Sequence, residues 1–432
     1  MAGTFRCRAM TRTLAAVALL VFSASSAVAQ PGGSRPAARP PNVVFVMADD
    51  FGYECVRANG GTSYRTPHLD ALAAGGVRFT HAFATPLCTP SRVQLMTGRY
   101  NFRNYVRFGQ FPFGERTFAQ VLKEAGYATF IAGKWQLAGG FDGPGRVGFD
   151  EYCLWQLFEQ AKGSRYAGPK LHAAGRLLPN LENRYGEDVF REHAEAFALK
   201  NKDRPFLIYW PMALTHAPFE PTPDSRPGTA TGAATFPDMV AYLDKTFGAF
   251  VSFLERHGLR ENTLIVFTGD NGTGRPITST LDGRPIRGDK GHTTTAGTHV
   301  PLIVNGPGAA KGRVCSDLID FTDLFPTLAA AAGARPPAGL DGRSFLPQVR
   351  GEAGTPREWV LGHYEPRHTG FEGVKVRYAH DRRHKLYHDG RLFDMEADVL
   401  EQTALAADAA PAARRALQAV LDRYEREVPL AK

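Results

Sequence analysis

Short, continuously hydrophobic runs alternate with amphipathic segments along most of the chain. The runs are rich in β-branched residues, which is typical of strands buried on both faces of a sheet, and they cover residues 42–48, 128–132, 205–212 and 263–268. Between them, apolar residues recur at helical spacing over residues 118–125, 188–199 and 237–257. Alternating strands and helices predict an α/β fold in which a mostly parallel sheet is sandwiched by helices.

After about residue 342 the pattern changes to short segments with the alternation of antiparallel strands. These segments cover residues 359–364, 374–379, 385–387 and 392–394, and a proline-led helix is predicted over residues 411–425. We therefore predict a main domain over residues 42–342 and a smaller C-terminal α+β subdomain, carrying an antiparallel sheet, over residues 343–432.

Residues 1–29 have the pattern of an export signal peptide. Three arginines precede an apolar run at residues 14–22, and small residues offer a cleavage site near Ala29. Residues 30–41 are rich in proline and glycine and are predicted to form a linker. The apolar run is short for a bilayer span, and no other stretch is long enough. We therefore expect an exported protein, periplasmic or secreted, without stable membrane insertion.

The charge of the chain gives little support for nucleic-acid binding. The formal net charge is +8, three of the arginines lie in the export signal, and no dense block of lysine and arginine remains. A mild basic excess suits an anionic substrate, but a solvated basic surface explains it equally well.

The cysteines beyond the signal show neither zinc-site spacing nor a CxxC motif; they are Cys55, Cys88, Cys153 and Cys315. An oxidising compartment permits one disulfide, for which Cys153 and Cys315 are a candidate pair. Sequence alone leaves the pairing among Cys55, Cys153 and Cys315 open.

Polar residues follow the ends of the predicted strands; they are Asp49, Asp50, Lys134, His216, Asp270 and Asn271. Each of them alone could be a helix cap or a turn residue. Ligands of parallel sheets bind outside the carboxyl ends of the strands, so we expect the whole set to converge at one edge. Three carboxylates and an amide are oxygen ligands suited to Ca²⁺ or Mg²⁺, whereas the lack of cysteine ligands and paired histidines argues against zinc.

A helix is predicted to begin at the stretch Cys88-Thr89-Pro90-Ser91-Arg92, with Cys88 just before its amino end, where an anion is favoured. The cysteine could be a low-pKa nucleophile, a redox thiol, the precursor of a more reactive group, or simply a buried residue. Arg92, Lys134 and Lys290 add positive charge, and His216 can act as an acid near neutral pH. The combination fits transfer of a sulfuryl or phosphoryl group.

The chain resembles the type I, arylsulfatase-like sulfatases of the alkaline phosphatase superfamily, whose signature is C-x-P-S-R. The other motifs follow in the order of that family, and the likeness extends from about residue 41 to the end. They are Asp49-Asp50-Phe51-Gly52, Thr66-Pro67-His68-Leu69-Asp70, Gly133-Lys134-Trp135, Thr215-His216-Ala217-Pro218, Gly269-Asp270-Asn271-Gly272 and Asp289-Lys290-Gly291. Each tripeptide alone is weak evidence, but the ordered set is specific.

The resemblance implies a sulfatase whose nucleophile is made after translation. A separate maturation enzyme would oxidise Cys88 to Cα-formylglycine, whose hydrate is a geminal diol that can expel sulfate by breaking a carbon–oxygen bond. One calcium ion, in preference to magnesium, would be held by Asp49, Asp50, Asp270, Asn271 and an oxygen of modified Cys88. Arg92 would steady the diol, Lys134 and Lys290 would hold sulfate oxygens, and His216 would protonate the departing alcohol. The substrate would be a sulfated small molecule, such as an aryl sulfate, or a sulfated glycan.

Two positions depart from the family pattern. The family commonly has histidine where this chain has Gln136, and glutamine cannot accept a proton at neutral pH. His299 stands where the family often has arginine, and we expect it to pack rather than to contact substrate. Two alternatives therefore stay open: a phosphodiester or phosphonate hydrolase of the same superfamily, or a homologue that binds sulfated glycans without turnover.

Overall fold

The computed structural model describes residues 39–159 and 163–430. The predicted export signal, its cleavage site near Ala29 and most of the predicted linker lie outside these residues. Among the described residues, no helix has both the length and the apolar character needed to cross a bilayer.

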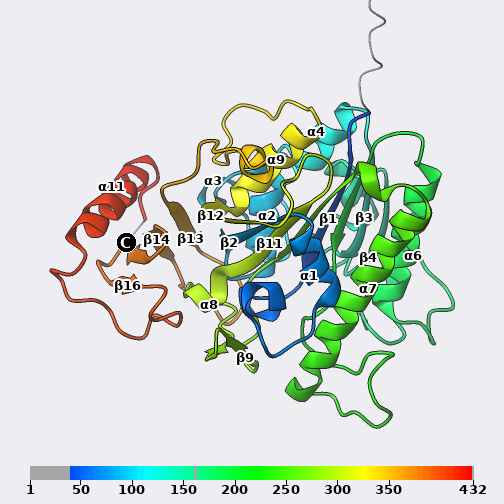
Figure 1. Ribbon diagram of the computed structural model, residues 1–432, viewed down its shortest axis with the longest axis horizontal. Helices are drawn as coiled ribbons and strands as arrows, with labels where there is room; N and C mark the ends of the chain where they lie inside the picture. The colour runs from blue at the N-terminus through cyan, green and yellow to red at the C-terminus, as the bar shows by residue number, and fades with distance from the viewer. Residues whose placement is uncertain (1–38, 160–162, 431–432) are drawn as a thin grey trace, which may run out of the picture. The chain divides into compact units, whose positions relative to one another are not determined.

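A ten-stranded mixed sheet forms the centre of the described part of the chain (Figure 1). Its central strands β8, β1, β7 and β3 are neighbours and all run parallel to one another. β11 is antiparallel to both of its neighbours, as is β5. The strands in spatial order are β12 (Arg313–Asp320), β2 (Val77–Phe83), β11 (His299–Asn305), β8 (Thr263–Gly269), β1 (Asn42–Ala48), β7 (Phe206–Pro211), β3 (Ala128–Lys134), β4 (Glu151–Trp155), β5 (Leu171–Ala173) and β6 (Arg176–Leu177).

Helices cover both faces of this sheet because its central strands are apolar on both sides. In β1, Val44 and Val46 pack with helices α1 (Pro67–Ala74), α6 (Gly186–Lys200) and α7 (Phe236–Arg256). The alternate residues Val43 and Phe45 pack on the opposite face with α2 (Cys88–Thr97), α4 (Phe118–Glu124) and α9 (Leu324–Ala331). The predicted α/β fold, with a mostly parallel sheet between helices, is confirmed.

Shorter elements connect the main ones. They are the helices α3 (Asn101–Asn104), α5 (Gly143–Arg146), α8 (Thr295–Thr298) and α10 (Leu346–Val349), and the antiparallel pair β9 (Thr278–Leu281) and β10 (Arg284–Arg287). α8 follows the loop that carries Lys290.

A separate four-stranded antiparallel sheet follows near the C-terminus. Its strands are β13 (Val360–Tyr364), β14 (Val376–His380), β15 (His384–Tyr387) and β16 (Leu392–Asp394), in that spatial order. Helix α11 (Pro411–Glu427) buries Leu417, Leu421 and Tyr424 in a cluster with Leu361 and Ala379 of the sheet. The predicted antiparallel sheet and its covering helix are confirmed, while the domain boundary at residue 342 stays a prediction.

The structure corrects two expectations. Cys88 is the first residue of α2 rather than the residue before it. The candidate disulfide between Cys153 and Cys315 is wrong, because both cysteines, like Cys55 and Cys88, are free and buried. Cys153 is in β4 and Cys315 in β12, and six strands lie between these two in the sheet. At about 4.8 Å per strand step, the seven steps between them amount to roughly 34 Å.

Candidate active site

Four neighbouring parallel strands bring the predicted polar residues to one edge of the sheet. β8, β1 and β3 end immediately before or at the residues concerned, and the segment after β7 leads to His216. Backbone hydrogen bonds join these strand ends: Asp49 N donates to Leu214 O at 2.8 Å, and Asp270 N donates to Ala48 O at 2.9 Å. The predicted convergence of Asp49, Lys134 and Asp270 at this edge therefore agrees with the structure.

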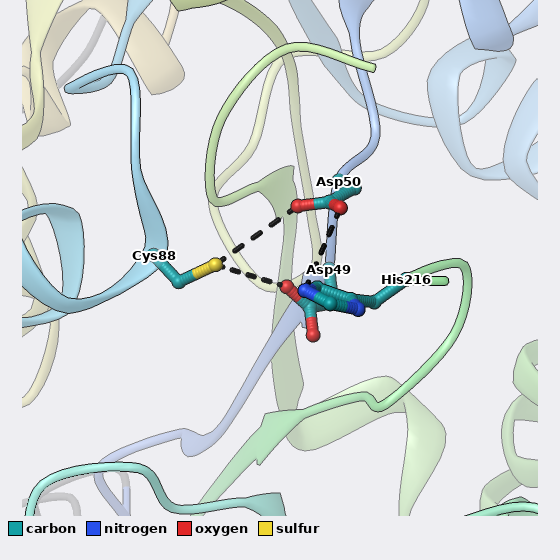
Figure 2. A group of neighbouring side chains, drawn as sticks. All are labelled: Asp49, Asp50, Cys88 and His216. Atoms are coloured by element: carbon teal, nitrogen blue, oxygen red, sulfur yellow. Dashed lines mark hydrogen bonds and ion pairs between the residues drawn. The ribbon is translucent and has the colours of Figure 1, made fainter. Parts of the chain in front are cut away.

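Cys88 faces the two aspartates that follow β1, as Figure 2 shows. Its Sγ donates to Asp49 Oδ1 at 3.4 Å and lies 3.9 Å from Asp50 Oδ1. The turn before α2 is held by Ser91, whose hydroxyl is 2.7 Å from that of Thr85. Burial, followed by the negative charge of Asp270, raises the pKa of the Cys88 thiol far above its usual value. The encoded cysteine is thus held as a thiol, which disfavours the alternative of a low-pKa cysteine nucleophile.

Three cations balance the three buried carboxylates. Lys134 Nζ donates to both oxygens of Asp49, at 2.7 and 3.0 Å. The other two ion pairs join Lys290 Nζ to Asp50 Oδ2 at 2.7 Å and Arg92 Nη2 to Asp270 Oδ2 at 3.1 Å. Arg92 also donates to the carbonyl of Lys134 at 2.9 Å, which links α2 to the end of β3.

The carboxylates differ in how strongly they hold a proton. Burial acts to raise the pKa of Asp49, but Lys134 and the other nearby cations outweigh it and hold that pKa well below its ordinary value. Asp50 behaves in the same way, with Lys290 as its main cation. In contrast, burial and the charge of Asp49 raise the pKa of Asp270 to about 7. Mutual repulsion among buried carboxylates is a condition that a bound divalent cation would relieve.

The donor set fits a hard metal ion. Ligand atoms of Asp49, Asp50, Cys88 and His216 all lie within 4.8 Å of one another. Asn271 donates through Nδ2 to Asp50 Oδ1 at 2.9 Å, whereas its buried Oδ1 has no hydrogen-bond partner among the described residues. A buried amide oxygen without a donor is a natural cation ligand.

Asp270 is held differently from the other expected metal ligands. Its Oδ1 accepts a hydrogen bond from Asp50 N at 3.0 Å and its Oδ2 faces Arg92. His216, which we expect to serve as an acid, also lies in the group of close ligand atoms.

His216 lies at the mouth of the site with its side chain 24 % exposed, and its Nε2 is 3.8 Å from Asp50 Oδ2 (Figure 2). Partial burial and the neighbouring Lys290 ammonium lower its pKa below the usual value. The loop that carries it is fixed by two residues that the sequence did not single out. Glu187 accepts hydrogen bonds from Trp210 Nε1 at 2.8 Å and Ala213 N at 3.1 Å, and the Tyr166 hydroxyl donates to Ala213 O at 2.8 Å.

Of the two departures from the family pattern, Gln136 is buried and His299 is partly buried. Gln136 has a positive φ of 56°, and its Oε1 has no partner among the described residues. The ring of His299 is stacked between Tyr53, at 4.1 Å, and Phe83, at 5.0 Å, and its Nε2 lies 2.9 Å from Thr80 O. The expected packing role of His299 is confirmed.

Comparison with known proteins places this site in a family. The family model described as "Sulfatase" matches residues 41–334. Human arylsulfatase A is 34% identical over 361 residues, covering 74% of this chain and 70% of that protein. N-acetylgalactosamine-6-sulfatase of Canis lupus familiaris is 31% identical, covering 77% and 69% respectively. A solved structure of Ps i-CgsB in complex with k-i-k-neocarrahexaose superposes with a TM-score of 0.75 at 25% identity, covering 89% of this chain and 93% of that one.

The fold and the site define a member of the alkaline phosphatase superfamily. Within it, the chain belongs to the sulfatase family. It is therefore an enzyme, a sulfuric ester hydrolase, as the motifs of its sequence predicted.

Proposed function

We propose that this sulfatase is exported and removes sulfate from a sulfated carbohydrate or an aryl sulfate, using formylglycine derived from Cys88 and one calcium ion. The observation that carries the proposal is the position of Cys88, whose Sγ faces Asp49 and Asp50 at the point where both lysine ion pairs meet. A carbohydrate substrate is favoured because relatives and neighbours are named for N-acetylgalactosamine 6-sulfate or bind a neocarrahexaose.

The residues present would hold both groups that the chemistry needs. Asp49, Asp50, Asp270 and Asn271 would bind calcium together with an oxygen of modified Cys88. When bound, calcium supplies positive charge and the hydrated aldehyde supplies an oxygen nucleophile. Conversion of Cys88 would require a separate formylglycine-generating enzyme.

The surrounding cations would orient the sulfate group. Lys134 and Lys290 each hold a carboxylate at 2.7 Å and have further N–H donors for sulfate oxygens. Arg92 is buried and fixed at both Asp270 and the carbonyl of Lys134, so it would hold the nucleophile in place without moving itself. His216, at the mouth of the site, is the residue from which a proton would reach the departing alcohol.

The modification is tested by mass spectrometry of the tryptic peptide that contains position 88, taken from protein made in its native host. We expect an aldehyde in place of the thiol. An intact cysteine would contradict the proposed nucleophile, and Cys88→Ser provides the control peptide that cannot be converted to the aldehyde by thiol oxidation.

The reaction is tested with two chromogenic substrates that share 4-nitrophenol as leaving group. We expect turnover of the sulfate monoester to exceed that of the phosphate diester. Faster turnover of the diester would favour the phosphodiesterase alternative, and glycan binding without turnover, despite confirmed formylglycine, would favour the non-catalytic one.

A further inference from the structure

A cavity of about 440 Å³ lies between the loop that carries Lys290 and the C-terminal sheet. Its volume is within the range of about 300–1,000 Å³ that is usual for small-molecule sites. One wall is formed by Gly291 to Thr294, and the opposite wall by Tyr364, Phe371 and Arg391.

The cavity adjoins the catalytic cluster. Gly291 follows Lys290 directly, and its N–H donates to the carbonyl of Pro86, two residues before Cys88, at 2.9 Å. The Phe371 ring packs so closely on Gly291 that an added Cβ there would lie 2.7 Å from it. A ligand that fills the cavity would therefore extend along the same loop that presents the Lys290 ammonium.

The lining combines aromatic rings with exposed positive charge. Arg391 lies 5.1 Å from the ring centre of Tyr387, and its side chain is 56 % exposed. Arg275, which is 53 % exposed, contributes from the side of the main sheet. Flat apolar rings together with guanidinium groups suit a sugar ring that carries an anionic substituent.

The carboxylate that lines the cavity does not oppose this charge. Glu401 is almost fully buried, and its oxygens accept hydrogen bonds from Lys385 Nζ at 2.7 Å, Thr295 N at 2.8 Å and the Tyr387 hydroxyl at 2.5 Å. The acidic partners of the two arginines, Asp389 and Asp289, lie outside the lining. The cavity therefore presents more cationic than anionic groups to a ligand.

We propose that this cavity is a subsite for a second anionic group, sulfate or carboxylate, on a sugar unit adjoining the sulfate ester that is cleaved. This inference rests on the proposed function, since it names the substrate class: an oligosaccharide with at least two negative charges rather than a monosulfated aryl compound. Arg391 and Arg275 bind the second group, and the aromatic rings contact the sugar.

The test uses binding, so that it does not depend on turnover. Calorimetric titration of full-length Cys88→Ser protein is carried out with sucrose octasulfate as the sulfate probe and trigalacturonic acid as the carboxylate probe, at about 0.15 M salt to limit long-range attraction. We expect Arg391→Met, added to this protein, to weaken binding of at least one probe about ten-fold, as loss of a charge-assisted hydrogen bond does. The probe affected identifies the anionic group.

Arg383→Met is the matched control. Arg383 lies in the same C-terminal region, is 59 % exposed and pairs with Asp394 at 2.8 Å, but it does not line the cavity. We expect it to bind both probes as the parent protein does. Arg275→Met, from the opposite wall, repeats the test should Arg391→Met fail to fold. Unchanged binding in the folded cavity variants, or equal weakening by Arg383→Met, would overturn the proposal.

Turnover of 4-nitrophenyl sulfate by matured wild-type protein is measured separately. That substrate carries one anionic group and reports on the sulfatase reaction alone. Absence of sulfate release from both 4-nitrophenyl sulfate and sucrose octasulfate, with specific probe binding, would contradict the proposed function and leave the subsite in place, whereas turnover without an effect of the cavity variants would contradict the subsite only.

Discussion

Arg92 and Asp270 form a buried ion pair in which each side chain compensates the charge of the other. Both side chains are almost completely shielded from solvent, and Arg92 Nη2 is 3.1 Å from Asp270 Oδ2. Removing one member of such a pair leaves an uncompensated charge in the interior, at a cost of about 3–5 kcal/mol. We therefore expect Arg92→Met to lower the free energy of unfolding by about that amount in urea denaturation.

Arg99→Met is the control for this prediction. Arg99 lies just after the same helix and pairs with Glu115 at 3.0 Å, but its side chain is 35 % exposed. An exposed pair contributes about 0–1 kcal/mol, so the control is expected to unfold nearly as the wild type does. Equal losses of unfolding free energy in the two variants would show that burial of the Arg92–Asp270 pair does not increase the cost of breaking it.

A metal ion bound at the site would stabilise the folded protein. A ligand that binds only the folded state raises stability by about 2.7 kcal/mol when present at 100 times its dissociation constant. We expect Ca²⁺ to raise the thermal unfolding temperature of chelator-treated protein. Asn271→Leu, which removes the buried amide oxygen that has no donor among the described residues, should reduce this rise. The rise should persist in Asn262→Leu, because the Asn262 side chain is partly exposed and donates to Pro40 O. An unfolding temperature that does not respond to Ca²⁺ would count against the site.

Sequence could predict which residues converge at the site, but it could not predict the ion pairs that they form there. Asp49, Lys134 and Asp270 follow buried strands, and parallel strands must end at a common edge, so their convergence follows from sequence. Which cation meets which carboxylate depends on side-chain reach, and sequence does not encode that directly. Glu187 was missed because it contacts the site only through backbone amides. An acidic residue in the first turn of a helix gives no signal that it is buried.

At the scale of elements, Glu187 ties helix α6 to the segment that follows β7. It is fully buried, and burial raises its pKa from the ordinary 4.5 to about 7. Because the folded state holds this proton more tightly than the unfolded state, ionisation of Glu187 costs stability as the pH rises from 4.5 to about 7. Over that window the cost reaches up to about 3 kcal/mol.

Glu187→Gln tests this dependence, because glutamine keeps the shape and does not ionise. We expect the decline in unfolding free energy between pH 4.5 and 7 to be shallower in the variant than in the wild type. Glu192→Gln, on the exposed face of the same helix, should retain the wild-type slope. The comparison is of slopes, since the substitution also alters the hydrogen bonds to Ala213 and Leu214. Parallel curves for all three proteins would refute the burial argument.

Strands were easiest to predict where both of their faces are buried in the protein interior. β1, β7 and β8 are buried on both faces and read as unbroken apolar runs. β2 was missed because its sequence VRFTHAF is partly exposed, and β11 because Pro301 interrupts a run that would otherwise read as a strand. α2 is buried on every side, including Arg92, and so lacks the amphipathic pattern by which helices are found; it was predicted from the proline in its first turn, Pro90.

At the scale of the whole molecule, the C-terminal sheet supports the loop that carries Lys290. Lys385 of β15 is buried, and its Nζ donates to Thr293 O at 2.5 Å and to Glu401 at 2.7 Å. Glu401 in turn accepts from Thr295 N at the start of α8. These hydrogen bonds connect the C-terminal sheet to the loop that carries Lys290 and to the start of α8.

Lys385→Met should loosen this connection. It removes the hydrogen bond to Thr293 O and leaves Glu401 buried without its cation, so we expect a loss of about 3–5 kcal/mol in unfolding free energy. We also expect faster hydrogen exchange at the amides of residues 291–298 than in the wild type, because the loop loses its anchor. Arg383→Met, with its exposed pair in the same sheet, should change neither quantity appreciably. If exchange increased throughout the C-terminal sheet but not in the loop, Lys385 would stabilise its own sheet and the connection to Lys290 would be contradicted.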